Sequence, residues 1–179
     1  MDGPDRVTHP FPPLFDENSR ILILGSFPSV KSREQMFFYG HPQNRFWKML
    51  AAVFGEDVPA SIEEKKRLVL SHHLALWDVI ASCEIRGSSD SSIRNAQVND
   101  FSQIFAGCRI DRILVNGSTA WQLYEKYARP VTGREALRMP STSPANAAWS
   151  LERLVTAWEP ELQTAACQSA SGREWYTRE

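Results

Sequence analysis

The chain has 179 residues, of which 42% are hydrophobic and 23% are charged, the balance of an ordinary globular domain with one substantial core. The three cysteines are scattered, which excludes a disulfide framework and a four-cysteine metal site. The net charge of −1 excludes a protein that grips polyanions through its overall charge. No apolar run is as long as a membrane span and no signal peptide is evident, so we expect a cytoplasmic protein without membrane contact.

The predicted elements alternate between buried strands and amphipathic helices. Residues 1–18 are rich in proline and predict an extended lead-in. Short apolar runs predict strands over residues 20–25, 74–80, 112–116 and 137–140. Apolar stripes and capping residues predict helices over residues 44–54, 61–72, 100–105, 118–127 and from Asn146 to about Trp158. Residues 82–98 are expected to form a long functional loop, and residues 162–179 an irregular C-terminal tail.

Alternating strands and helices predict an α/β fold: a three-layer α/β/α sandwich with a central four-stranded, mainly parallel sheet. No repeat or linker divides the chain, so we expect a single domain over residues 19–161. The carboxyl ends of parallel strands meet at one edge of a sheet. The polar segments at residues 25–32, 77–82, 116–117 and 140–146 should therefore line one crevice.

The expected crevice lacks the motifs that are typical of covalent catalysis and of metal or cofactor binding. The sequence has no glycine-rich dinucleotide motif, phosphate-loop lysine motif, nucleophile elbow or metal-ligand spacing, so we expect no cofactor and no metal. Amides, hydroxyls, one histidine and aromatic rings remain, which can stack a flat ring, bond its edges and position a water. A flipped nucleobase is a ligand of this kind. Nearby Lys31, Arg33 and Arg45 would contact phosphates, although a solvated basic face is the alternative reading.

Three segments resemble a known family. They read GSFPS (residues 25–29), YGHPQNRFW (residues 39–47) and PSTSPA (residues 140–145). Together they resemble the uracil-DNA glycosylase superfamily over about residues 18–160, and most closely its deoxyinosine (hypoxanthine) DNA glycosylases, which are related to the mismatch-specific uracil/thymine glycosylases. The resemblance implies a monofunctional glycosylase that removes a deaminated base, preferentially hypoxanthine, in base excision repair. A mismatch-specific uracil glycosylase and a catalytically silent nucleic-acid-binding relative are the alternatives.

The resemblance also implies roles for individual residues. The first segment corresponds to the water-activating loop, but Phe27 stands where mismatch glycosylases have asparagine. The deoxyinosine branch also lacks that asparagine, and the resemblance to it implies that Asn44 is the catalytic residue, with Asn116 as a second functional amide and Tyr39 stacking on the base. The other expected base contacts come from Ser26, Phe27 and His41. The expected DNA contacts come from Lys31, Ser32, Arg45, Ser141, Thr142, Ser143, Pro144 and Ala145.

Simpler roles stay open when the residues are considered without the family. Asn44 would serve as a helix cap and Asn116 as a turn residue. Tyr39 could be core packing, and His41 a structural histidine. Asp78, near the end of the predicted strand over residues 74–80, is expected to orient a loop, with a catalytic role as the alternative. The expected partner is double-stranded DNA with a deaminated base, with single-stranded DNA as a possibility, and the expected state is a monomer.

Overall fold

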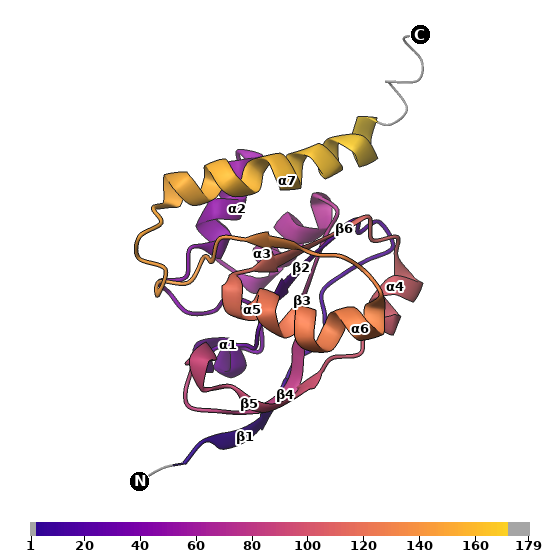
Figure 1. The fold of residues 1–179 in the computed structure, drawn as a ribbon. Coiled ribbons are helices and arrows are strands. Elements are labelled where there is room, and N and C mark those ends of the chain that lie inside the picture. Colours follow the sequence, from indigo (N-terminus) through magenta and orange to yellow (C-terminus); the bar gives the residue numbers. More distant parts are fainter. Residues whose placement is uncertain (1–2, 172–179) are drawn as a thin grey trace.

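The computed structural model describes residues 3–171, with side chains for residues 3–163 (Figure 1). The strands are β1 (Asp5–Thr8), β2 (Ile21–Gly25), β3 (Leu74–Asp78), β4 (Ile80–Ile85), β5 (Arg94–Val98), β6 (Arg112–Asn116) and β7 (Leu137–Met139). The helices are α1 (Val30–Gln35), α2 (Phe46–Phe54), α3 (Ile62–Ser71), α4 (Ser102–Gly107), α5 (Ser118–Leu123), α6 (Arg129–Thr132) and α7 (Leu151–Ser171). A short 3₁₀ turn, η1 (Asp90–Ser92), follows β4, and a π-helical turn, η2 (Tyr124–Ala128), joins α5 to α6.

The central sheet has four parallel strands in the order β3-β2-β6-β7. Every residue of β2 is buried, because the strand lies inside the sheet and both of its faces are covered. Helices α2 and α7 pack together on one face, and α5, η2 and α6 lie on the other (Figure 1). The predicted α/β/α domain with a four-stranded parallel sheet is confirmed.

A second, antiparallel sheet in the order β1-β4-β5 was not expected from the sequence. Residues 5–8 lie in the predicted lead-in, which is extended there as expected but pairs as a strand. Residues 80–85 and 94–98 fall largely in the predicted long loop, so that prediction is wrong in these places. The predicted strand over residues 74–80 is interrupted at Val79, where the chain passes from the parallel to the antiparallel sheet. Backbone bonds from Val79 N to Gly25 O (2.8 Å) and from Ile80 N to Ser26 O (3.1 Å) fix this junction to the end of β2.

The helices depart from prediction in several places. Helix α1 was missed; Ser29 caps it, with the Ser29 hydroxyl accepting from Ser32 N–H at 3.1 Å. Helix α2 begins at Phe46, two residues after the predicted start. Helix α7 begins at Leu151, after Ser150, and not at Asn146, whose side chain instead donates to Ser141 O at 3.0 Å.

The C-terminal prediction is also partly wrong, because α7 runs on to Ser171 and makes residues 162–171 helical. The rest of the predicted tail, residues 172–179, lies outside the described residues. Ser61 caps α3: Glu64 N–H donates to Ser61 Oγ at 3.1 Å, and Glu64 Oε2 accepts from the N–H of Ala60, one residue before the cap, at 2.6 Å. Across the described part of the chain, no helix combines the length and apolar character needed to cross a membrane.

Candidate active site

A cavity of about 240 Å³ opens at the carboxyl ends of the parallel strands. The loops after β2 and β7, the last residues of β3 and β6, and the segment around η1 contribute to its wall, together with the segment that leads into α2. The predicted crevice is therefore confirmed. Twelve of the fourteen predicted site residues line it: Ser26, Phe27, Ser32, Tyr39, His41, Asn44, Asn116, Ser141, Thr142, Ser143, Pro144 and Ala145. Lys31 and Arg45 do not.

Thr142 joins the two predicted catalytic amides. Its hydroxyl accepts a hydrogen bond from Asn116 Nδ2 at 3.0 Å and donates one to Asn44 Oδ1 at 2.8 Å. The Thr142 backbone N–H also donates to Asn116 Oδ1 at 3.0 Å, so the Asn116 amide is held at both ends. Thr142 itself is fully buried. The sequence placed this residue in a DNA-contacting loop, but the structure makes it the link between Asn116 and Asn44.

The orientation of Asn44 follows from this link. Its Oδ1 accepts from Thr142 and also from Phe46 N–H at 3.0 Å, at the start of α2. With the carbonyl oxygen used twice, the Nδ2 group is the end of the amide without a protein partner among the described residues. The cap-like and functional roles of Asn44 are thus compatible, because the contact that starts the helix also orients the amide in the cavity.

Tyr39 has a backbone conformation that is rare for its residue type, and its ring packs against Phe46. Its φ of 51° lies in the left-handed region, which a bulky residue rarely adopts and which often marks functional sites. One face of the ring stacks on Phe46, with centroids 4.0 Å apart and planes at 24°. The ring also lines the cavity, as a residue that stacks on a base must. The following N–H, of Gly40, is fixed by a 2.8 Å bond to Ser32 Oγ.

The Tyr39 hydroxyl lies at the buried end of this ring and has no hydrogen-bond partner within the described residues. Desolvation by burial raises the pKa of Tyr39, the negative charge of Asp78 raises it further, and the nearby Asn116 amide opposes both effects. The hydroxyl is therefore neutral, and its capacity to donate and to accept a hydrogen bond is not used by the described residues.

Phe27 and His41 line different parts of the cavity wall. The Phe27 ring is buried, with the Arg33 guanidinium 5.7 Å from the ring centroid and the His9 ring edge-on at 6.0 Å. His41 Nδ1 accepts from Gln43 N–H at 3.1 Å, so in the neutral imidazole the proton is on Nε2. Phe27 thus contributes an apolar wall, and His41 a donor, to the cavity.

The predicted DNA contacts separate into two groups in the structure. Ser32 is buried and holds the turn at Gly40, so its observed contacts are within the protein. Arg45 donates from its terminal nitrogens to the backbone carbonyls of Ser143 (3.0 Å), Asn146 (3.1 Å) and Trp149, which fixes the loop after β7. Lys31 is exposed on α1 and forms a surface ion pair with Glu34 at 3.3 Å. Of these three side chains, Lys31 is the one open to a phosphate.

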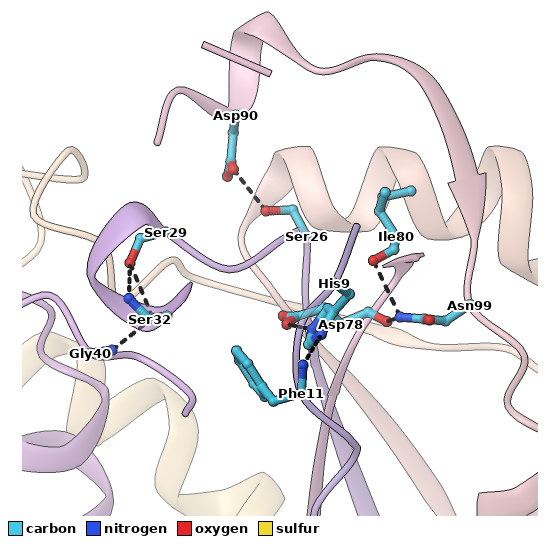
Figure 2. A network of polar contacts seen from close by, with 10 residues as sticks. All are labelled: His9, Phe11, Ser26, Ser29, Ser32, Gly40, Asp78, Ile80, Asp90 and Asn99. Carbon is cyan, nitrogen blue, oxygen red and sulfur yellow. Dashed lines mark hydrogen bonds and ion pairs between the residues drawn. The ribbon is translucent and has the colours of Figure 1, made fainter. Parts of the chain in front are cut away.

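Sequence reasoning missed a polar cluster on the side of the cavity next to the second sheet (Figure 2). His9 Nε2 lies 2.7 Å from Asp78 Oδ2, and both side chains are almost fully buried. Asn99 Nδ2 donates to the backbone carbonyls of Asp78 (2.8 Å) and Ile80 (3.2 Å). His9 follows β1, in the segment that was expected to be an extended lead-in. Local sequence carried no signal for its contact with Asp78, 69 positions away.

A second carboxylate stands at the edge of the same cavity. Asp90 accepts a 2.8 Å hydrogen bond from the Ser26 hydroxyl and so ties η1 to the first loop. Although the residue as a whole is exposed, desolvation of its carboxyl group raises the pKa of Asp90, the Ser26 bond lowers it, and the charge of Asp78 raises it. No group of three or more metal-ligating side chains occurs in the described residues.

Comparisons with known proteins agree on one family. The sequence profile of the "Uracil DNA glycosylase superfamily" matches residues 12–163. A protein named hypoxanthine DNA glycosylase from Methanosarcina acetivorans is 38% identical over 151 residues, which are 83% of this chain and 94% of that protein. Its namesake from Methanosarcina barkeri is 37% identical over 139 residues, which are 76% and 86% of the two chains.

The solved structures give the same result. A solution NMR structure of a candidate uracil DNA glycosylase from Methanosarcina acetivorans superposes with a TM-score of 0.71 at 33% identity, and the match covers 89% of this chain and 96% of that one. The matched range contains the four parallel strands and the cavity at their carboxyl ends. This chain belongs to the uracil DNA glycosylase superfamily.

Proposed function

We propose that this protein is a monofunctional DNA glycosylase that hydrolyses the N-glycosidic bond of a deaminated base, preferentially hypoxanthine, in base excision repair. The observation that carries the proposal is the Asn116–Thr142–Asn44 chain of hydrogen bonds, which leaves Asn44 Nδ2 without a protein partner in a base-sized cavity. The names of the curated relatives support the choice of hypoxanthine. Phe27, in the position of the usual asparagine, argues against a uracil glycosylase that acts through the first loop.

The proposed reaction starts when the damaged nucleotide leaves the DNA stack, at a cost of a few kcal/mol that is lowest at a weak pair. The base enters the cavity against Tyr39, whose ring is supported from behind by Phe46. Asn44 Nδ2 donates to an edge of the base. As the bond from C1′ to the base breaks, the sugar gains oxocarbenium character and the base gains negative charge, which the oriented amide stabilises. Water then adds to C1′.

Further parts of the proposal concern the product and the partner. No lysine lines the cavity in the described part of the chain, so no Schiff base forms and the abasic strand stays intact. The protein acts as a monomer on double-stranded DNA, and activity on single strands is a second possibility. The loop from Ser141 to Ala145 borders the cavity and would enter the minor groove beside the extruded nucleotide. The cytoplasmic location stays a prediction.

Duplex oligonucleotides that carry one hypoxanthine, uracil or xanthine test the proposal directly. Each is incubated with the protein in EDTA and then divided, with alkali added to one half. Strand breaks at hypoxanthine that appear only after alkali support a monofunctional hypoxanthine glycosylase. Breaks at uracil alone would instead identify a uracil glycosylase. DNA binding with no break at any of the three bases would identify a silent binder and refute the proposal.

Replacement of Asn44 tests the residue that carries the argument. Asn44→Ala should lower the single-turnover excision rate on the order of 10²–10³-fold, the range for loss of one preorganised donor. Asn18→Ala is the matched control, because Asn18 is an exposed asparagine just before β2, at the opposite edge of the sheet. Equal rates for wild type and Asn44→Ala would show that Asn44 is not catalytic.

A further inference from the structure

The water that attacks C1′ needs a group to orient it, and the first loop does not supply one. Phe27 offers no polar atom where the mismatch glycosylases have an amide. Asn116 has both ends of its amide bonded to Thr142. Asn44 Oδ1 is likewise occupied by two donors. The side chains expected to be catalytic therefore have few free acceptor atoms for a water proton.

Asp78 has a free acceptor atom in the same cavity. It is the last residue of β3, lies beside Gly25 across the parallel pairing, and lines the cavity. Oδ2 is bonded to His9, whereas Oδ1 accepts no hydrogen bond from the described residues. A Cβ atom on Gly25 would lie only 2.5 Å from Asp78 Oδ1, so the missing side chain is what lets this oxygen approach the end of β2.

The environment of Asp78 is that of a positioned anion. A buried carboxylate is costly unless it is hydrogen-bonded, and here one oxygen is paired while the other borders the cavity. The backbone around it is fixed by Asn99, by the Val79 N–H bond to Gly25 O, and by the His9 N–H bond to Ala81 O at 2.7 Å. The carboxylate thus has little freedom to turn away when a substrate enters.

His9 provides the rigidity on the other side. The ring lies between Phe11, with centroids 4.5 Å apart, and Trp77, with centroids 4.4 Å apart, so aromatic packing fixes its plane. The side chains of His9 and Asp78 are only 2% and 7% exposed, which keeps water from competing for their contact. A histidine locked in this way sets which carboxylate oxygen faces the cavity.

We propose, on the basis of the function proposed above, that Asp78 is a catalytic residue that orients and deprotonates the attacking water, and that His9 is its positioning residue. The C1′–N bond breaks and its electron pair leaves with the base. The water oxygen bonds to C1′, and one water proton passes to Asp78 Oδ1. The departing base takes up a proton from solvent, and Asp78 later returns its proton to solvent. Before the proton transfer, the carboxylate charge also stabilises the positive sugar.

The first test is Asp78→Asn, which keeps the size of the side chain and removes its charge. We expect the single-turnover rate on a hypoxanthine duplex to fall on the order of 10²–10³-fold. The melting temperature and the affinity for a duplex with an uncleavable hypoxanthine nucleotide should stay close to wild type. Asp111→Asn is the matched control, since Asp111 is exposed just before β6 and pairs with Arg109 at the other edge of the sheet.

Chemical rescue separates catalysis from a structural role. In Asp78→Ala the side chain is lost, and added formate can supply a carboxylate in its place. We expect formate to raise the Asp78→Ala rate in proportion to its concentration, with sodium chloride at equal ionic strength as the control because DNA binding depends on salt. Wild type and Asp111→Asn should show no such increase. Absence of rescue in a folded Asp78→Ala protein counts against the assignment.

His9 is tested by a conservative and a disruptive change. His9→Gln keeps an N–H that can reach Asp78, and should retain most of the rate. His9→Leu removes it, and should lower the rate roughly 10–100-fold, as the loss of groups that orient metal ligands does, with unchanged affinity for the uncleavable duplex. Equal losses in both variants, matched by equal losses of melting temperature, would reduce His9 to a packing residue and overturn its positioning role.

The outcomes distinguish this inference from the function on which it rests. If wild type excises hypoxanthine and Asp78→Asn does so within about three-fold, the proposed function stands and the role of Asp78 is refuted. The role is also refuted if Asp78→Asn loses rate, affinity and melting temperature together and formate has no effect on Asp78→Ala. If wild type excises none of the deaminated bases, the proposed function falls and the assignment of Asp78 falls with it.

Discussion

Thr142→Val removes one hydroxyl and keeps the shape of the side chain. In the folded protein that hydroxyl accepts from Asn116 Nδ2 and donates to Asn44 Oδ1, at 3.0 and 2.8 Å. The change therefore disconnects the two amides without creating a cavity. Each amide keeps one bond, from Thr142 N–H to Asn116 and from Phe46 N–H to Asn44, so neither is left without any partner.

Two magnitudes follow from this geometry. Two hydrogen bonds at a net value of about 1 kcal/mol each give a loss of about 1–3 kcal/mol in the free energy of unfolding. At roughly 2–4 °C per kcal/mol for a chain of this size, the melting temperature should fall by about 2–12 °C. The rate should fall more, because misplacement of a reacting group by about 1 Å costs roughly 10²-fold.

Thr142→Ser is the matched control. It keeps the hydroxyl and loses a buried methyl group, at a cost of about 1 kcal/mol. Thermal melting and single-turnover excision, with protein in excess over a hypoxanthine duplex, should therefore separate the two variants. Both should be modestly less stable, whereas only Thr142→Val should be slow. Wild-type rates in Thr142→Val, or equal rate losses in both variants, would refute the idea that this hydroxyl orients Asn44.

Three further predictions concern other contacts of the site. Gly25→Ala should lower the free energy of unfolding by about 1–3 kcal/mol and slow excision, because the added Cβ would meet Asp78 Oδ1. Thermal melting and single-turnover rates check the two effects, and a variant with neither would contradict the close approach. Arg45→Lys should cost about 1–3 kcal/mol of unfolding free energy, since an ammonium cannot serve three carbonyls in the same planar geometry, and should make the loop after β7 more sensitive to proteolysis. Burial and the charge of Asp78 raise the pKa of Tyr39, so the folded protein holds the phenol proton more tightly than the unfolded chain does. The contribution of this group to the free energy of unfolding is complete below the unfolded pKa near 10 and is lost as pH rises through the raised folded pKa. Since Tyr39 does not ionise near pH 10, Tyr39→Phe should leave the amplitude of the ultraviolet tyrosine titration there unchanged. Loss of one tyrosine's amplitude near pH 10 would contradict the raised pKa.

The parallel sheet could be predicted because each of its strands has a recognisable pattern in the local sequence. Residues 21–25 and 74–77 are continuous apolar runs, each followed directly by a polar residue (Ser26 and Asp78), and in the structure both runs are buried throughout. The second sheet has no such pattern. Strand β1 is mostly exposed and β5 is largely polar, so their pairing with β4 depends on contacts between distant segments that no local window contains.

The residues of the candidate site could be predicted in part, but the contacts between them could not. Asn44, Asn116 and Tyr39 lie in segments that resemble a family, and the ends of parallel strands bring them to one cavity. The sequence did not indicate how they connect, because the role of Thr142 depends on its burial between two amides. His9 was missed for a stronger reason: it lies in a proline-rich segment, and only the folded chain brings it to Asp78.

Strand β1 covers a sheet edge that could otherwise pair with another molecule. The family match begins at residue 12, so a chain shortened to that range would keep the parallel sheet and lose β1. The backbone N–H and C=O groups of β4 that now pair with Asp5 to Thr8 would then form an open sheet edge, which readily pairs with another molecule. The native edge is instead presented by β1, whose charged Asp5 and Arg6 disfavour such pairing. Residues 5–8 therefore disfavour self-association through this edge of the sheet.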